Sequence, residues 1–247
     1  MSDWFKSSAL DVLAGDVGGM ERKNELLHSD LLARHGDSPM AVGWSSAVSQ
    51  RSRLDRVFKQ FEYSPNPHPS VLDVGCGLGD LAPLFQGYNW RGSYLGIDVN
   101  CNAIRLANER RLMDVPAPQY VSFKCVGLLQ FQTDLQFDLV VASGLFSLGA
   151  NPDERAEVDY DWQKYVTDAI RKMRELARHA VIVNFLSAFA AEQQPGMAYV
   201  SPGFMLDMLT EAFGPRIVLN HDDRTNDFTV TMPLTPYPSY SAEVGAK

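Results

Sequence analysis

The chain has 247 residues, of which 45% are hydrophobic, so it is long enough for one large α/β domain or two small ones with a full core. Its formal net charge of −8 argues against broad binding to duplex nucleic acid or an anionic membrane, and it favours a small-molecule partner. The N-terminus lacks a signal-peptide pattern, and no apolar segment approaches the roughly 20 residues that span a bilayer. We therefore expect a cytoplasmic monomer or homodimer.

The cysteines are odd in number and have no short paired spacing. Cys76, Cys101 and Cys125 therefore suggest neither a disulfide framework nor a metal site. We expect reduced, small apolar side chains in strands and turns, and no bound metal.

Residues 1–65 are predicted to form a helical cap or lid. Helical patterns cover 3–15, 20–36 and 45–63, and Gly36 and Gly43 separate the helices. The proline-rich stretch SPNPHPS at 64–70 then ends the helical region, so a domain boundary is predicted there.

From residue 66 to residue 235, strand patterns and helix patterns alternate. The predicted strands are 70–76, 93–99, 120–126, 137–143 and 180–187, and the predicted helices are 79–87, 100–113, 160–178 and 201–214. Nearly continuous apolar runs such as LVVA and AVIV are typical of strands buried on both faces. The alternation therefore predicts a mainly parallel sheet with helices on both sides.

The C-terminal part breaks this alternation. Two β-rich runs, 216–221 and 227–234, are joined by a short polar connection without a helix, which predicts an antiparallel hairpin. The expected fold is a doubly wound α/β sheet of seven strands, mainly parallel, that ends in this hairpin. Residues 236–247 are predicted to be an irregular tail.

The stretch VLDVGCGLGDLA at 71–82 carries glycines at three alternate positions, Gly75, Gly77 and Gly79. Such glycines between a strand and a helix indicate that the backbone closely approaches a ligand, or else only a neighbouring helix. A dinucleotide fingerprint would have another glycine where this chain has Asp80. Because a carboxylate there would repel a diphosphate, the loop favours a ligand without phosphates.

In this region the sequence resembles the class I S-adenosylmethionine-dependent methyltransferases. Val71 to Gly79 resembles the family's first motif, Tyr94 to Asp98 its second, Phe137 to Ser143 its fourth-strand motif, and the hairpin its reversed last strand. The resemblance covers roughly residues 65–235 and implies S-adenosylmethionine as the cofactor. It also implies methyl transfer to an oxygen, nitrogen or sulfur atom of a small molecule.

The resemblance also implies a set of donor-binding residues. These are Asp73, Gly75, Cys76, Gly77, Gly79, Asp98, Val99, Gly127, Leu128, Ser143 and Gly144. The glycine loop is expected to turn its amides toward the donor's carboxylate, and Asp98 to accept from both ribose hydroxyls. Asp98 could instead be a helix cap, and Asp73 could either brace the loop or contact the donor's ammonium group. The family's acidic residue for the adenine amino group is absent, because Gly127 and Leu128 follow the third strand.

An O–H or N–H⁺ acceptor would need a base, and the candidates by chain position are His221, Tyr160 and Asn184, with Asp159 and Asp161 on either side of Tyr160. The alternative for His221 is a hydrogen-bonded structural histidine. The remaining histidines considered, His28, His35 and His68, are expected at the surface.

Four residues are candidates for contact with the acceptor, namely Trp44, Arg51, Leu145 and Phe146. Arg51 could clamp a carboxylate or be a solvated helix residue, and Leu145 and Phe146 could form a site wall or simply pack in the core. The sequence also resembles uncharacterised bacterial and phage-borne methyltransferases with a Gly-Trp…Gln-Arg stretch before the first motif and Ser-Gly-Leu/Ile-Phe after the fourth strand.

Other functions remain open. Methylation of a nucleic acid is disfavoured because ASGLF follows the fourth strand in place of an (N/D/S)PP(Y/F) signature, and no cysteine follows a proline. Methylation of a protein and a non-catalytic role as an S-adenosylmethionine-binding sensor or partner subunit are further alternatives. Aminopropyl transfer is disfavoured because no acidic constellation suited to a polyamine is found.

Overall fold

The computed structural model describes residues 17–44, 46–86, 90–113, 120–148, 160–222 and 226–235. The helix predicted at 3–15 and the tail predicted at 236–247 lie outside these residues. Within the described part of the chain, no helix is long and apolar enough to cross a membrane.

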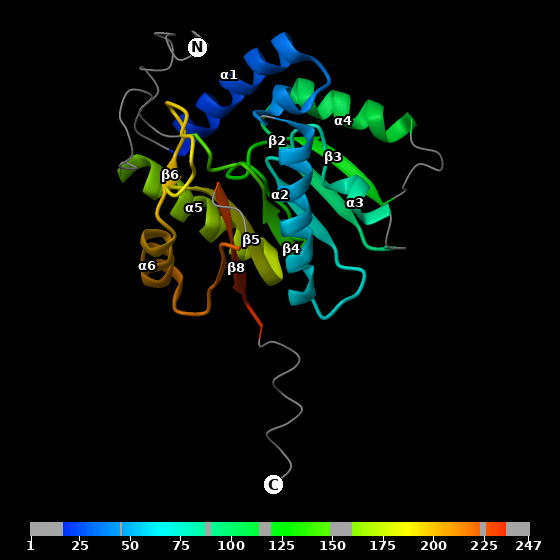
Figure 1. The fold of residues 1–247 in the computed structure, drawn as a ribbon. Helices are drawn as coiled ribbons and strands as arrows, with labels where there is room; N and C mark the ends of the chain where they lie inside the picture. Colours follow the sequence, from blue (N-terminus) through cyan, green and yellow to red (C-terminus); the bar gives the residue numbers. More distant parts are fainter. Residues whose placement is uncertain are drawn as a thin grey trace.

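The centre of the molecule is one mixed sheet, and its strands follow the predicted pattern (Figure 1). The strands are β1 (Val71–Val74), β2 (Tyr94–Asp98), β3 (Val121–Cys125), β4 (Phe137–Ala142), β5 (Ala177–Ser187), β6 (Tyr199–Val200), β7 (Val218–Asn220) and β8 (Asp227–Pro233). Their order is β3-β2-β1-β4-β5-β8-β7; β1 to β5 are parallel, and β8 runs antiparallel to both of its neighbours. The predicted α/β fold with a C-terminal antiparallel hairpin is therefore confirmed. The two-residue β6, which pairs with β5, was not predicted.

Helices cover both faces of the sheet. They are α1 (Val17–His35), α2 (Ala47–Lys59), α3 (Ala82–Gln86), α4 (Cys101–Met113), α5 (Tyr160–Leu176) and α6 (Pro202–Phe213), with short 3-10 helices η3 (Pro39–Val42) and η4 (Gln60–Tyr63). Side chains of α5 and α6 share one hydrophobic core with the sheet, whereas α2 and α3 contribute to the other. This arrangement buries the central strands β1, β4 and most of β5 on both faces, as their continuous apolar runs predict.

The helix α2 belongs to the same core as the strands. It begins where the Ser46 hydroxyl accepts a hydrogen bond from the Ser49 amide at 3.1 Å, and it buries Leu54 and Val57 against the sheet. The domain boundary near residue 65 stays a prediction, since the helix before it packs on the sheet that follows.

The helix α1 lies across the end of the sheet from which the loops after β1 and β2 leave (Figure 1). This position is the one that the predicted lid would need. Because the carboxyl ends of parallel strands meet at this same edge, α1 faces the place where ligands bind in open α/β sheets.

The cysteine prediction is wrong, because Cys101 and Cys125 form a disulfide with their Cα atoms 5.0 Å apart. Parallel pairing sets Cys125, the last residue of β3, opposite Asp98, and α4 begins at Cys101. Fold topology therefore brings together two residues whose sequence separation of 24 gave no sign of pairing. Cys76 is a free thiol.

Candidate active site

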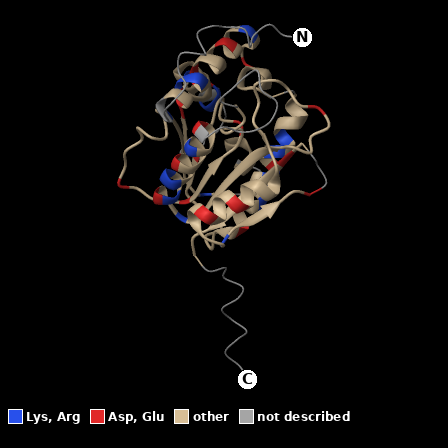
Figure 2. Ribbon diagram, turned by 90° about the vertical axis from the view of Figure 1, so that its left-hand side faces the viewer, with Lys and Arg blue, Asp and Glu red and all other residues tan. Residues whose placement is uncertain are grey.

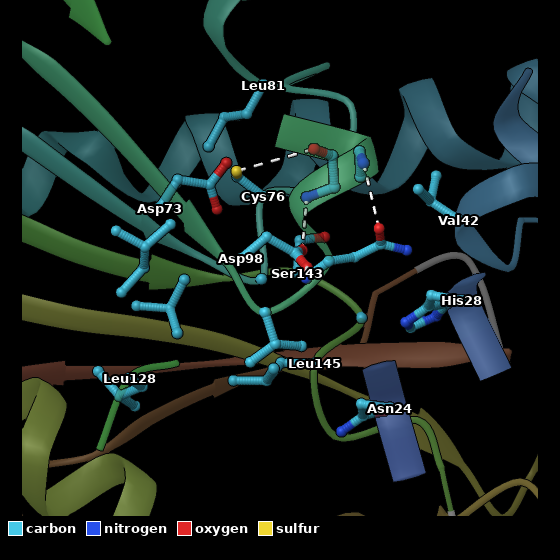
Figure 3. Close-up of a pocket in the computed structure, with 18 of the residues that line it drawn as sticks. Asn24, His28, Val42, Asp73, Cys76, Leu81, Asp98, Leu128, Ser143 and Leu145 are labelled. Carbon is cyan, nitrogen blue, oxygen red and sulfur yellow. Dashed lines mark hydrogen bonds between the residues drawn. The ribbon is translucent and has the colours of Figure 1, made fainter. Parts of the chain in front are cut away.

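A first cavity lies at the carboxyl edge of the sheet, between the loops after β1 to β4 and the helices α1, η3 and α2 (Figure 3). In Figure 3, Asn24 and His28 project from one helix toward Asp98, Ser143 and Leu145 across the cavity. The lining includes almost all the predicted donor-binding residues, namely Asp73, Gly75, Cys76, Gly77, Asp98, Val99, Gly127, Leu128, Ser143 and Gly144. The exception is Gly79, which lines another, smaller pocket beside α4.

The glycine loop after β1 is tight for two physical reasons. Gly75 and Gly77 have φ angles of 71° and 54°, which side chains other than glycine rarely adopt. A Cβ on Gly77 would also lie 2.9 Å from the Val42 side chain, so the loop packs closely under η3. However, the Gly75 and Cys76 amides donate to the Ile97 carbonyl, at 2.8 and 3.1 Å. The expectation that these amides face a ligand carboxylate is therefore not met in this structure.

Asp98, at the end of β2, organises the middle of the cavity. Its Oδ2 accepts a hydrogen bond from the Gly77 amide at 2.9 Å, and its Oδ1 accepts one from the Asn100 amide at 2.8 Å. Since each carboxylate oxygen can accept more than one hydrogen bond, both oxygens can still receive a ligand hydroxyl.

Asn100 has an unused donor at this position. Its Oδ1 caps α4 by accepting from the amides of Asn102 and Ala103, at 3.1 and 3.2 Å. Its Nδ2 is buried without a hydrogen-bond partner among the described residues, and Asn100 lines the cavity. A buried donor of this kind is costly unless a ligand satisfies it, so this end of the cavity suits the polar atoms of a nucleoside.

Asp73 makes a hydrogen bond within the protein. The Tyr94 hydroxyl donates to its Oδ2 at 2.5 Å, and the side chain is buried beneath the glycine loop. Burial raises the pKa of Asp73 to about 7 despite the hydrogen bond from Tyr94, and the charges of Asp98 and Asp80 add to the rise. This hydrogen bond joins Asp73 to β2, and because Asp73 also lines the first cavity, both of its expected roles stay predictions.

Asp80 ties the glycine loop to two helices. It accepts hydrogen bonds from Gln50 of α2 and Arg110 of α4, both at 2.8 Å. Burial raises the pKa of Asp80, and the hydrogen bond from Gln50 opposes that rise. The residue that made a dinucleotide unfavourable in the sequence therefore also anchors the loop to two helices.

A carboxylate that the sequence did not reveal stands at the far end of the cavity. Glu21 of α1 lies over the loop after β3, where its Oε1 accepts from the Leu129 amide at 3.4 Å. A Cβ on Gly127 would lie 2.5 Å from its Oε2 and closer still to Gln130 Oε1, so the ends of these two side chains pack closely on Gly127. Burial raises the pKa of Glu21, although hydrogen bonds from Leu129, Gln130 and Leu128 oppose the rise. An acid is thus present near Gly127, but it comes from a helix 108 residues earlier in the chain than Leu129.

A second cavity adjoins the first. Its volume is about 230 Å³, against about 90 Å³ for the first, so it has the more room for a small metabolite. The two cavities share four lining residues, namely His28, Val42, Trp44 and Gly144. The rest of the second lining is an apolar wall that includes Leu27, Leu31, Leu148, Leu186 and Met197, and a polar corner that includes Ser49, Arg53, Tyr199 and Asn226.

His28 stands at the junction of the cavities and not on the open surface, where the sequence had placed it. Burial lowers the pKa of His28, and the charge of Asp98 opposes this effect. Its imidazole is therefore held toward the neutral form, which can accept a proton.

The structure does not bring the predicted catalytic residues together. His221 packs against the rings of Phe189 and Phe228, each with ring centres 5.9 Å apart, and lines neither cavity. Asn184 accepts a hydrogen bond from the Gly144 amide at 2.8 Å and so positions the loop after β4. Tyr160 is the first residue of α5, and its side chain lies outside the described part. The catalytic role of all three stays a prediction.

Of the four residues predicted to contact the acceptor, two line a cavity and two do not. Trp44 lines both cavities and Leu145 lines the first. Phe146 packs in the core, where its ring stacks on Phe185 at 5.5 Å between centres. Arg51 points outward and pairs with Asp55 at 2.9 Å, and the arginine that lines the second cavity is Arg53, two residues further on.

Comparison with known proteins agrees with this geometry. Residues 71–160 match a family described as a methyltransferase domain. A Mycobacterium tuberculosis protein, Rv1506c, whose name provisionally describes it as a methyltransferase, is 23% identical over 163 residues, which are 65% of this chain and 90% of that protein.

Solved structures show the same fold. Magnesium protoporphyrin IX methyltransferase from Synechocystis PCC 6803 with bound S-adenosylhomocysteine is similar with a TM-score of 0.61 and 15% identity, over 90% of this chain and 100% of that one. The CcbJ methyltransferase from Streptomyces caelestis gives a TM-score of 0.58 and 13% identity, over 83% and 96% of the two chains. At these identities the likeness shows the fold.

Proposed function

We propose that this chain, an S-adenosylmethionine-dependent methyltransferase whose residues 71–160 match a methyltransferase-domain family, methylates a small molecule bound in the second cavity. The proposed acceptor atom is an oxygen, nitrogen or sulfur nucleophile. When bound, S-adenosylmethionine would supply a methyl group on a positively charged sulfur. The nucleophile would attack the methyl carbon in line with the carbon–sulfur bond, and the sulfur would leave.

The observation that carries the proposal is the junction of the two cavities. The first cavity contains the residues suited to a nucleoside, since Asp98 can accept from the ribose hydroxyls and Asn100 has an unmet donor. The second meets it at His28, Trp44 and Gly144, so a molecule there would face the methyl-bearing end of the donor site. Holding two reactants in adjoining pockets is the main contribution that a methyl transfer requires.

We assign the role of general base to His28. A hydroxyl loses its proton as an oxygen lone pair forms the bond to carbon and the carbon–sulfur bond breaks, whereas a protonated amine must lose its proton before its nitrogen has a lone pair for that attack. The support for this role is that His28 lines both cavities and that burial favours its neutral form. The proton passes to the imidazole, and the other product is S-adenosylhomocysteine.

The surface charge supports a small acceptor. Figure 2 shows Lys and Arg interspersed with Asp and Glu along the helices. Several helix cations form ion pairs with acids three or four residues away, such as Arg34 with Asp30 and Arg105 with Glu109. Basic side chains engaged in this way are less available to a phosphate backbone.

The test uses tritium on the methyl group of S-adenosylmethionine and a metabolite extract freed of protein and treated with nuclease. We expect label to appear in the small-molecule fraction. Label that enters only added protein or nucleic acid, or tight donor binding without any transfer, would contradict the proposal.

Two variants then separate catalysis from folding. His28→Gln should lower the transfer rate about 100-fold or more and leave the affinity for S-adenosylhomocysteine within about threefold of the wild type. His35→Gln, an exposed histidine on the same helix, serves as the matched control and should change neither quantity. An undiminished rate in His28→Gln would remove His28 from the mechanism.

A further inference from the structure

We propose that the acceptor carries a carboxylate and that Arg53 binds it in the polar corner of the second cavity. This assignment rests on the proposed function, since it names the chemical class of the molecule that the second cavity receives. The sequence analysis had named Arg51 as the residue that could bind a carboxylate, whereas Arg53 is the arginine that lines the cavity.

Arg53 is fixed in position by contacts on two sides. Its Nε donates to Asp227 Oδ2 at 2.6 Å, and its guanidinium carbon lies 4.4 Å from the centre of the Trp44 ring. Arg53 lines the second cavity, and the hydrogen bond from its Nε to Asp227 is the one that its guanidinium makes among the described residues. A guanidinium held in this way presents its remaining N–H groups without further loss of side-chain freedom.

The charges around Arg53 do not balance within the protein interior. Arg53 and Arg56 each expose only 11% of the side chain, and both pair with Asp227, which exposes 5%. The other acid in contact, Asp222, lies 3.5 Å from Arg56 and exposes 39% of its side chain to solvent. Two buried cations therefore share one buried anion. Since an uncompensated buried charge is costly, a bound anion would stabilise this cluster.

The rest of the second cavity suits the body of such a molecule. Leu27, Leu31, Leu186 and Met197 form an apolar wall, and Trp44 lies between the two cavities. Glu192 also contributes to the lining, and its charge favours a singly charged carboxylate over a doubly charged phosphate. The site thus fits an amphipathic small molecule with an apolar body and one carboxylate.

The first experiment asks whether the acceptor is an anion. The nuclease-treated metabolite extract is passed over an anion-exchange resin, and the flow-through and the salt eluate are each incubated with labelled donor. We expect transfer only with the eluate, and we expect treatment of the eluate with phosphatase to leave that transfer unchanged. Activity in the flow-through, or its loss after phosphatase treatment, would overturn the carboxylate assignment. If neither fraction accepts label, the proposed function itself fails, so the two failures are distinguishable.

The second experiment tests Arg53 directly with the active eluate. Arg53→Met should lower transfer at limiting eluate by about 10- to 100-fold, whereas Arg51→Met, the exposed neighbour, should behave as the wild type. Because Arg53→Met leaves Asp227 with one fewer partner, the double variant Arg53→Met/Asp227→Asn is included, with affinity for S-adenosylhomocysteine as the test of folding. Normal transfer by a variant without Arg53 would overturn the assignment. Loss of transfer with unchanged donor affinity supports it.

Discussion

The carboxyl group of Asp73 has a consequence for stability, because it is buried beneath the loop that shapes the donor site. Its pKa of about 7 lies above the ordinary value near 4, so the folded chain keeps a proton that the unfolded chain releases. This contribution to stability is fully present below about pH 4 and is lost as the pH rises through about 7.

We therefore expect the stability of the folded chain to fall as the pH rises. Between pH 5 and pH 8, the free energy of unfolding of the wild type should fall by roughly 1 to 4 kcal/mol relative to that of Asp73→Asn, which cannot titrate. Urea unfolding of both proteins at several pH values measures this difference. Parallel curves for the two proteins across this range would show that Asp73 is ionised throughout.

The role of Glu21 can be tested by comparing the affinities of two ligands. We predict that its carboxylate accepts a hydrogen bond from the adenine amino group, beside the loop at Gly127. The wild type should then bind S-adenosylhomocysteine at least about tenfold more tightly than the inosine analogue, in which an oxygen replaces that amino group.

The variant Glu21→Gln distinguishes an adenine contact from a simple brace of the β3 loop. Its preference between the two ligands should fall to within about threefold, because an amide can donate to the inosine oxygen. Glu25→Gln, on the same helix and paired with Arg22, is the control and should keep the full preference. If Glu21→Gln weakens both ligands by the same factor, Glu21 only supports the loop.

Among the elements, α4 and β3 are joined covalently next to the donor site. The disulfide connects the first residue of α4 to the last residue of β3, and Asn100 and Val126 beside it both line the first cavity. The bond therefore fixes the spacing of the two loops between which a purine would lie.

Reduction should loosen that spacing. For a separation of 24 residues, the chain-entropy model gives a stabilisation of about 3 kcal/mol. Denaturant unfolding with and without dithiothreitol should show a loss of this size in the wild type and none in Cys101→Ala/Cys125→Ala. An unchanged midpoint in the reduced wild type would contradict the prediction.

At the scale of the whole molecule, α1 connects the two cavities. Glu21, Asn24 and His28 line the first, and Leu27, His28 and Leu31 line the second. A ligand in the first cavity therefore contacts the same helix that shapes the second, which provides a physical route for donor binding to order the acceptor site.

Hydrogen exchange can detect this ordering. Saturating S-adenosylhomocysteine should slow amide exchange in residues 21–31 of α1 by about tenfold or more, since bound ligand suppresses local opening. The helix α6, which lines neither cavity, is the internal control. If the amides of α1 exchange at the same rate with and without ligand, donor binding does not order this helix.

The sequence predicted most of this fold because local patterns determine it. The alternating strands and helices and the terminal hairpin lie within short stretches, and both were confirmed. Contacts over long sequence distances were not predictable in the same way. Glu21 meets Leu129, and Cys101 pairs with Cys125, only because the parallel sheet stacks their loops at one edge.

The arginine that lines the second cavity could not be predicted from the sequence either, although it is only two residues from the predicted one. The sequence analysis correctly selected α2 but named Arg51 and not Arg53. These two residues are separated by about 200° around the helix axis. Which face of α2 meets the cavity depends on the burial of Leu54 and Val57 against the sheet. Tertiary packing therefore decided which arginine faces the site.

Calorimetric titration with S-adenosylhomocysteine tests the central claim most directly, since every role above depends on a donor in the first cavity. We predict saturable binding of one molecule per chain, weakened by about 10- to 100-fold in Asp98→Asn, where the ribose hydroxyls meet an amide in place of a carboxylate. Asp134→Asn, an exposed acid that lines neither cavity, should bind as the wild type does. Absence of binding to the wild type, or equal affinity in Asp98→Asn, would contradict the account.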